Sequence, residues 1–347
     1  MSYMAKRIRI YKAGGFDQLK IEDFDSPGPR DEDVKISVKS AGINFADTIV
    51  RQGHYASAKK YIWWPITPGF EVAGTVMSVG KKVDSFKVGD RVMAITLFNG
   101  YSSEIVVRAA NARKIPKVLS FDEAAGILAV FGTSYYANYW LNQPRRGSVC
   151  LVHSAAGGVG LALVQMLKEL GCTVIGVVGN SSKVAITKTY GADEVIDKSS
   201  QDLWKTVEKI APEGLDIVFD PNGASTFKQS YKHLKMTGKL IIYGHQSMLS
   251  KTKGKQNPLL LVMKYLQTPR FNAFNMVTDS KSVLGFNVSF FFDQQDMLTE
   301  FLNYIVAKIE NKKLRPLPVK TYSYTNIAQA HQDLQSGKTT GKLVINF

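Results

Sequence analysis

The chain has 347 residues, of which 45% are hydrophobic and 21% are charged, with a formal net charge of +15. These proportions are ordinary for a globular protein, and the length predicts two domains. No run of about 18 uncharged apolar residues occurs, so we predict no transmembrane helix. The N-terminus reads as a first strand and not as a signal peptide. With only Cys150 and Cys172, too few for a zinc cluster or a disulfide framework, we expect a cytoplasmic protein.

The positive charge is unevenly distributed. Residues 221–278 contain nine Lys or Arg and no Asp or Glu. A solvated basic face is the simpler interpretation, and attraction to an anionic surface or partner is the alternative. The stretch does not interleave basic and aromatic residues as nucleic-acid modules do, so no nucleic-acid partner is expected.

Short strands separated by turn residues are predicted up to about residue 116, which indicates a β-barrel-like domain. The expected strands are 7–11, 35–40, 72–79, 91–96 and 103–108. From residue 121 the period changes, and helices are expected at 122–128 and 132–141.

Strands and helices then alternate. The strands 149–152, 173–178, 194–196, 216–219 and 239–243 have helices between them. This order is typical of a doubly wound parallel sheet. The fold class is therefore α/β plus β. After a further helix at 297–309, the β-like segments 320–322 and 342–347 are expected to rejoin the first domain.

Residues 151–160 carry the strongest chemical signal. A strand leads into a turn of small residues and then into an amphipathic helix, with the spacing Ala155-x-Gly157-x-x-Gly160. Such a turn lets a diphosphate approach the backbone at the positive end of a helix dipole. The expected phosphate-binding residues are Ala156, Gly157, Gly158, Val159 and Gly160.

The second strand of this unit ends without an acidic residue. An Asp or Glu here grips the ribose 2′-hydroxyl of NAD, whereas the segment contains Gly179, Asn180, Ser181, Ser182 and Lys183. Hydroxyls, an amide and a lysine suit a 2′-phosphate, so NADPH is the expected cofactor. The alternative is that these residues cap the next helix and that the lysine is solvated.

Ordered motifs along the whole chain resemble one family, the zinc-free medium-chain dehydrogenases/reductases of the quinone oxidoreductase branch. The motifs lie at 41–47, 51–55, 68–74, 88–92, 123–125, 155–160, 190–193 and 340–342. Residues 220–223, 243–244 and 285–287 make the vesicle amine transport proteins of synaptic vesicle membranes the most similar subgroup.

The resemblance implies two domains with the active site in a cleft between them. A GroES-like β-barrel catalytic domain would comprise residues 1–127 and 275–347, and a Rossmann NADPH-binding domain residues 128–274. It also implies a homodimer. Zinc-dependent members place a Cys in the stretch that here ends at Asn44, and a His where this chain has Phe70. No metal is therefore expected.

Three residues match family positions near the nicotinamide and are the candidate catalytic residues: Tyr55, Asn44 and Asp47. Tyr55 can donate a hydrogen bond to a developing oxyanion, or it can merely cover the cleft. Asn44 is expected to orient the nicotinamide ribose or Asp47, and Asp47 can equally be a structural residue at a helix N-terminus. Further cofactor positions are Asn44, Thr133, Lys198, Asn222, Tyr243, Gly244, Phe286 and Asn287.

Two apolar segments depart from the simplest reductases. Residues 61–65 (Tyr-Ile-Trp-Trp-Pro) form a bulky insertion, which can narrow the cleft or pack against a neighbour. Residues 259–266 follow a basic stretch. We expect them to pack in the core, and the alternatives are a cleft wall, a dimer interface or an anionic membrane.

The sequence thus predicts an NADPH-dependent oxidoreductase that delivers hydride to a quinone or an α,β-unsaturated carbonyl without zinc. Two alternatives remain. One is a nucleotide-gated lipid- or membrane-binding module with weak or no reductase activity, which would make peripheral contact with an anionic membrane. The other is an enoyl-thioester reductase.

Overall fold

The computed structural model describes residues 4–248 and 257–347, and they form two compact units. Unit 1 ends at Gly132 and resumes at Ser289, while unit 2 begins at Thr133 and ends at Val288. The sequence predicts the division between the two domains after residues 127 and 274. Among the described residues, no helix is both long and apolar enough to cross a membrane.

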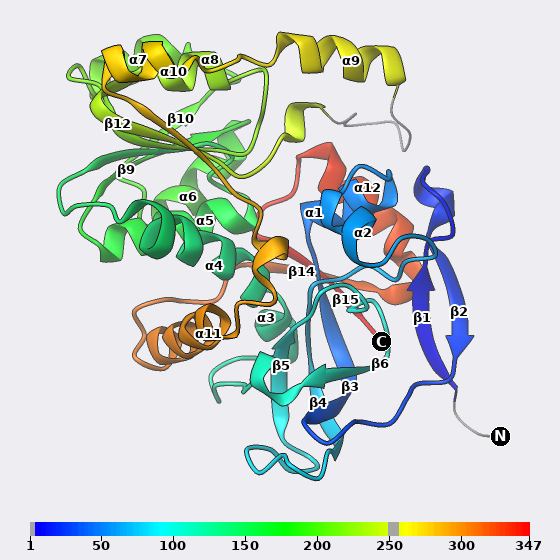
Figure 1. Ribbon diagram of the computed structural model, residues 1–347. Helices are drawn as coiled ribbons and strands as arrows, with labels where there is room; N and C mark the ends of the chain where they lie inside the picture. The colour runs from blue at the N-terminus through cyan, green and yellow to red at the C-terminus, as the bar shows by residue number, and fades with distance from the viewer. Residues whose placement is uncertain (1–3, 249–256) are drawn as a thin grey trace. The chain divides into compact units, whose positions relative to one another are not determined.

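Unit 1 is built around a seven-stranded, mostly antiparallel sheet and a separate β-hairpin-like pair (Figure 1). The pair is β1 (Ala5–Arg9) and β2 (Lys20–Phe24). The sheet runs β14-β15-β3-β4-β5-β7, with β6 also paired to β3. Its strands are β3 (Asp33–Ile43), β4 (Glu71–Val79), β5 (Arg91–Ile95), β6 (Glu104–Arg108), β7 (Ala112–Lys114), β14 (Val319–Ser323) and β15 (Lys342–Asn346).

The C-terminal strand lies inside this sheet, between β14 and β3. β15 pairs antiparallel with β3 over Leu343–Asn346, so the prediction that the tail rejoins the first domain is confirmed. The helices with residues in unit 1 are α1 (Phe45–Arg51), α2 (Ala56–Tyr61), α3 (Phe121–Ala125), α4 (Leu128–Tyr135, which crosses the unit boundary), α11 (Gln295–Glu310) and α12 (Ile327–Ser336).

Unit 2 is a six-stranded parallel sheet with helices on both faces, as the βαβ order predicted (Figure 1). The strand order is β10-β9-β8-β11-β12-β13. The strands are β8 (Val149–Val152), β9 (Thr173–Val178), β10 (Glu194–Asp197), β11 (Leu215–Asp220), β12 (Leu234–Ile242) and β13 (Ser282–Gly285).

The two faces of this sheet have separate apolar cores. α5 (Gly158–Glu169) and α6 (Val184–Thr189) cover one face, and α7 (Leu203–Ile210) and α8 (Phe227–Lys232) cover the other. A π-helical segment, Tyr136–Asn142, continues α4 and packs on the α5 side. Because both faces are buried, the strands are nearly continuous runs of apolar residues.

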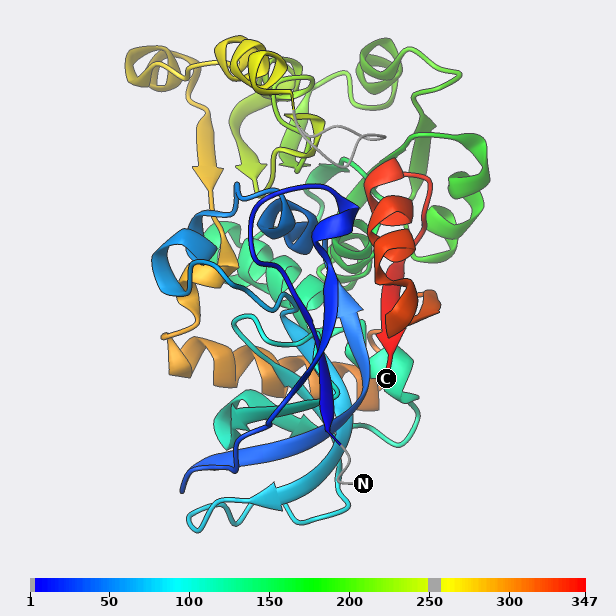
Figure 2. The ribbon, with the colours of Figure 1, turned by 90° about the vertical axis from the view of Figure 1, so that its right-hand side faces the viewer.

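The prediction that residues 259–266 pack in the core is wrong. They lie in α9 (Pro258–Gln267), which precedes α10 (Ala273–Asp279). Leu259 is 76% exposed and Phe274 of α10 is 83% exposed. The other exposed apolar side chains of these helices are Leu260, Val262, Met263, Tyr265, Leu266 and Val277. Figures 1 and 2 show α9 at the margin of unit 2, beyond the helices that cover the sheet.

The aromatic insertion at 61–65 is divided between core and surface. Trp64 packs against two apolar clusters of unit 1, whereas Trp63 is exposed. The insertion therefore contributes one anchoring ring to the fold of unit 1.

Candidate active site

The predicted site residues fall into two groups, one in each unit. In unit 2 the group lies at the carboxyl ends of the parallel strands, where ligands of doubly wound sheets bind. In unit 1 the group surrounds the N-terminus of α1.

The glycine turn of unit 2 has the geometry that its spacing predicted. Gly157 is the N-cap of α5, in an extended conformation, and no side chain caps the helix. A Cβ at Gly160 would lie 2.4 Å from the carbonyl oxygen of Ser154, so this position admits no side chain. The first N–H groups of α5 and its dipole therefore form an anion-binding end.

The turn after β9 presents polar groups and no carboxylate. Ser182 Oγ donates to Asn180 Oδ1 at 2.6 Å, and a Cβ on Gly179 would meet no atom within 4 Å. The Lys183 side chain is largely buried beside this turn, whereas Lys198 is exposed after β10, with its backbone N–H bonded to the Val178 carbonyl. The open space at Gly179 and the lack of an acidic side chain in this turn leave room for a phosphate here.

A buried hydrogen-bonded cluster around Asp220, which the sequence did not predict, supports the predicted cofactor position Asn222. Asp220 is fully buried and accepts from Asn222 N, Thr226 Oγ1 and Ser230 Oγ at 2.7–2.9 Å. His153 Nε2 lies 3.1 Å from Ser230 Oγ, and burial lowers the pKa of this imidazole. The Asp220 carboxylate thereby fixes the loop that carries Asn222.

Asn222 has a donor left over. Its Oδ1 accepts from Ser154 Oγ at 3.2 Å, while its buried Nδ2 has no hydrogen-bond partner among the described residues. An unpartnered buried donor is costly, and a bound ligand would satisfy it. A nicotinamide dinucleotide phosphate therefore fits this edge of unit 2, on the helix terminus, the space at Gly179 and the Asn222 amide.

Tyr243, Gly244 and Phe286 follow neighbouring strands at the same edge. The rings of Tyr243 and Phe286 stack at 6.2 Å, and burial raises the pKa of Tyr243 well above its usual value. A Cβ on Gly244 would lie 2.9 Å from the Pro221 carbonyl oxygen, so the backbone passes closely there. The remaining predicted positions of unit 2, Thr133 in α4 and Asn287 after β13, are partly buried.

In unit 1, Asp47 is an enclosed structural carboxylate. It is fully buried and accepts from Asn44 N at 2.7 Å, Gly69 N at 2.9 Å and Tyr101 Oη at 2.9 Å. Burial raises its pKa to about 6, and these three hydrogen bonds limit the rise. Of the two roles that the sequence left open, this geometry favours the structural one, since the carboxylate joins the start of α1 to the turn before β4.

Tyr55 follows α1 in the chain, at the start of α2. It is the N-cap of α2, partly buried, and its ring meets Phe70 edge-on at 5.7 Å. Phe70 in turn contacts Phe98 at 5.2 Å. The ring of Tyr55 is thus packed in an aromatic cluster with Phe70 and Phe98.

Asn44 is bound by two residues that sequence reasoning did not select. Its Nδ2 donates to Glu71 Oε1 at 3.1 Å, and its Oδ1 accepts from Lys342 Nζ at 2.5 Å. Lys342 Nζ also lies 2.6 Å from Glu71 Oε1. Both residues stand in motifs of the sequence, but nothing in those motifs indicates that positions 71 and 342 meet.

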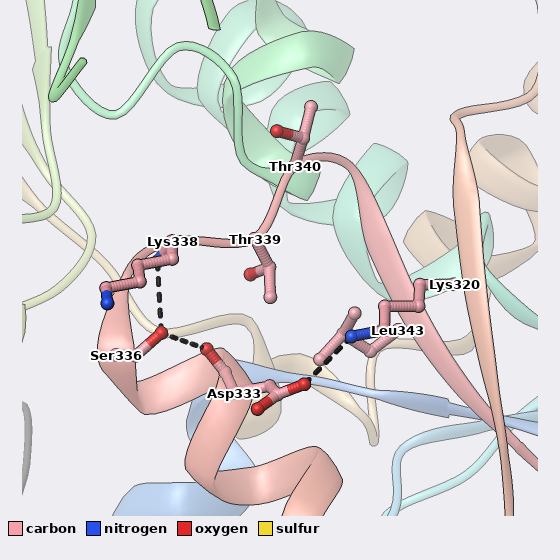
Figure 3. Close-up of a pocket in the computed structure, with 7 residues that line it drawn as sticks. All are labelled: Lys320, Asp333, Ser336, Lys338, Thr339, Thr340 and Leu343. Carbon is pink, nitrogen blue, oxygen red and sulfur yellow. Dashed lines mark hydrogen bonds and ion pairs between the residues drawn. The ribbon is translucent and has the colours of Figure 1, made fainter. Parts of the chain in front are cut away.

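A separate pocket of unit 1 contains none of the predicted residues. It has a volume of about 380 Å³ and is lined by Lys320, Asp333, Ser336, Lys338, Thr339, Thr340 and Leu343 (Figure 3). Lys320 and Asp333 pair with each other in its lining at 2.9 Å. Within residues 4–248 and 257–347, no cluster of three or more His, Cys, Asp or Glu is arranged to hold a metal ion.

Comparison with known proteins agrees with both units. Residues 30–146 match the alcohol dehydrogenase GroES-like domain, and residues 158–303 match the zinc-binding dehydrogenase family. The synaptic vesicle membrane protein VAT-1 homolog of Rattus norvegicus is 30% identical over 96% of this chain and 81% of its own length. Rattus norvegicus quinone oxidoreductase is 28% identical over 99% of this chain and 98% of its own length.

Solved structures give the same result. The Escherichia coli quinone oxidoreductase complexed with NADPH matches with a TM-score of 0.85 and 28% identity, over 99% of this chain and all of the other. A GroES-like domain joined to a Rossmann-type parallel sheet defines the class of medium-chain dehydrogenases/reductases. Within that class, the chain belongs to the quinone oxidoreductase branch, which includes the VAT-1 homologues.

Proposed function

We propose that the chain reduces a quinone or an α,β-unsaturated carbonyl with NADPH, without a metal ion. The observation that carries this proposal is the edge of unit 2, which has a helix N-terminus, a buried Asn222 Nδ2 without a partner among the described residues, and a turn without an acidic residue. The NADPH complex of the E. coli relative supports the same cofactor.

The residues of unit 2 bind and orient the cofactor. The N–H groups at the start of α5 hold the diphosphate, and residues 179–183 with Lys198 hold the 2′-phosphate. Asn222, Thr133, Tyr243, Gly244, Phe286 and Asn287 surround the nicotinamide end. The cofactor, when bound, supplies the hydride.

The residues of unit 1 complete the chemistry. Asn44 orients the nicotinamide ribose, and the Asp47 carboxylate fixes the backbone that carries Asn44. Tyr55 donates a hydrogen bond to the oxygen on which negative charge develops, since its phenol hydroxyl is a hydrogen-bond donor. Water supplies the proton.

The test is oxidation of NADPH and of NADH by the purified chain with a panel of quinones, enones and enoyl thioesters. Tyr55→Phe should lower kcat with a quinone, and Tyr61→Phe, at the other end of α2, is the matched control. Turnover with a quinone or enone and a preference for NADPH are expected. Binding of NADPH without turnover of any substrate would contradict the proposal.

A second candidate function has one specific observation in its favour, the exposed apolar face of α9 and α10. The chain is proposed in that case to bind an anionic membrane through this apolar face, with attraction from the basic residues of the stretch 221–278. Sedimentation with phosphatidylserine vesicles and with neutral vesicles tests it. Binding that is lost in Leu259→Ser supports this function, and absence of binding to either vesicle removes it.

The family resemblance offers another occupant for this face. A homodimer formed through the open edge of β13 would cover part of α9 or α10 with a second copy. Measurement of molar mass in solution distinguishes the dimer from the membrane, since only the dimer forms without lipid.

A further inference from the structure

Asn44 is held by a buried ion pair. Lys342 is 2% exposed and Glu71 is fully buried, and their charged groups lie 2.6 Å apart. The second carboxylate oxygen, Glu71 Oε2, accepts from the backbone N–H of Ala129 at 2.9 Å. The pair thus joins β4, β15 and α4 to the N-cap of α1.

The pair allows only one orientation of the Asn44 amide. With Oδ1 on the ammonium and Nδ2 on the carboxylate, both contacts are favourable. In the flipped orientation the amide nitrogen would face the ammonium and the amide oxygen would face the carboxylate. An asparagine side chain otherwise has a broad, roughly two-fold torsion, so this selection comes from the two charges.

Stability alone does not account for such a pair. Buried ion pairs are often replaceable by apolar residues of similar volume without loss of stability, because desolvation offsets the attraction. Glu71 and Lys342 are also too deeply buried to reach a ligand, whereas Asn44 is partly exposed. The group that the pair serves is therefore the amide.

We propose that Glu71 and Lys342 are positioning residues, which act through Asn44 by fixing its amide and leaving its second Nδ2–H for the ligand. The ligand contact of Asn44 rests on the proposed function above. The orientation of the amide does not, because it follows from contacts within unit 1.

The test compares two double variants, Glu71→Leu/Lys342→Met and the closer isostere Glu71→Gln/Lys342→Met, with Lys342→Met alone. The single variant leaves an unpaired buried carboxylate, so its melting temperature should fall by roughly 10 °C. At least one double variant should recover most of that loss. Lys320→Met/Asp333→Asn, which removes a more exposed ion pair between β14 and α12 of the same unit (Figure 3), is the matched control.

Two readouts follow the amide itself. The ¹⁵N-labelled side-chain signal of Asn44, assigned with Asn44→Ala, should move in every variant that lacks the pair and stay in place in the control. The kcat/KM for a quinone should fall about 10²-fold in the recovered double variant, as in Asn44→Ala, while the control keeps wild-type activity.

A recovered double variant with the wild-type Asn44 signal and wild-type kcat/KM would overturn the proposal. If the wild-type chain proves to have no reductase activity, the proposed function fails and the amide signal still decides this inference. A signal that moves with loss of the pair supports the inference in that case, and an unmoved signal refutes it.

Discussion

Three Gly→Ala substitutions at the nucleotide-binding edge of unit 2 separate folding from cofactor binding. At Gly160 the new Cβ would lie 2.4 Å from the Ser154 carbonyl oxygen and 2.7 Å from Ala155 Cα. These are backbone atoms, so the start of α5 must move. At Gly157 the only neighbour within 4 Å is the same oxygen at 3.4 Å, which is ordinary contact.

The expected magnitudes therefore differ. Gly160→Ala should lower the free energy of unfolding by about 2 kcal/mol, as overpacking usually does. Gly157→Ala should change it by less than about 0.5 kcal/mol, because the lower chain entropy of the unfolded state and the poorer N-cap nearly cancel. The Gly157 backbone is nevertheless where a diphosphate approaches, and a methyl group there should weaken NADPH binding about 10²-fold.

Thermal and urea unfolding with and without NADPH measure both effects. At a concentration of about 100 Kd, NADPH should add about 2.7 kcal/mol to the wild type, and only about 0.4 kcal/mol to a variant weakened 10²-fold. Gly179→Ala, whose Cβ meets nothing within 4 Å, is the control for folding. Full NADPH stabilisation of Gly157→Ala would refute the placement of the diphosphate, and wild-type stability of Gly160→Ala would refute the packing argument.

Three further predictions use the same measurements. Lys183→Ala should weaken NADPH binding roughly tenfold or more and leave NADH binding nearly unchanged, since it removes a charged partner of the 2′-phosphate; equal loss for both cofactors would contradict this. The pKa of Asp47 is about 6 in the folded chain against an ordinary 3.8. The contribution of the Asp47 carboxyl to the free energy of unfolding is therefore complete below about pH 4, and about 3 kcal/mol of it is lost as the pH rises through 6. Urea unfolding measures this loss, which Asp47→Asn should not show. Leu259→Ser and Phe274→Ser should each change the stability of dilute protein by less than about 0.5 kcal/mol; a loss of 2 kcal/mol or more would mean that these side chains are covered.

The elements that the sequence predicted well are those with a local signal. The run of small residues after β8 predicted both the turn and the helix that follows, because the close approach at Gly160 requires glycine. The parallel sheet of unit 2 followed from the order of strands and helices. The β-like segments 320–322 and 342–347 predicted that the C-terminal tail rejoins the first domain. Its antiparallel pairing with β3 is visible only in the structure.

The fate of α9 shows where local signals stop. The apolar run 259–266 predicted a buried helix, and the helix is present, but its apolar side chains are exposed. Periodicity reports that a face is apolar and not what covers it. Only the folded unit shows that the sheet of unit 2 is already covered by other helices.

Side-chain networks depend on contacts that no sequence window contains. Asp47 and Glu71 are both fully buried acids near the start of α1, and the sequence gives no reason to distinguish them. The structure does so through their partners. Asp47 is surrounded by two backbone amides and a phenol, neutral donors that only partly offset the cost of burying its charge. Glu71 faces the ammonium of Lys342, 271 positions later in the chain. Asp47, with its neutral hydrogen-bond donors, therefore holds the backbone of Asn44. Glu71 and Lys342, which are both charged, hold the side-chain amide of the same residue.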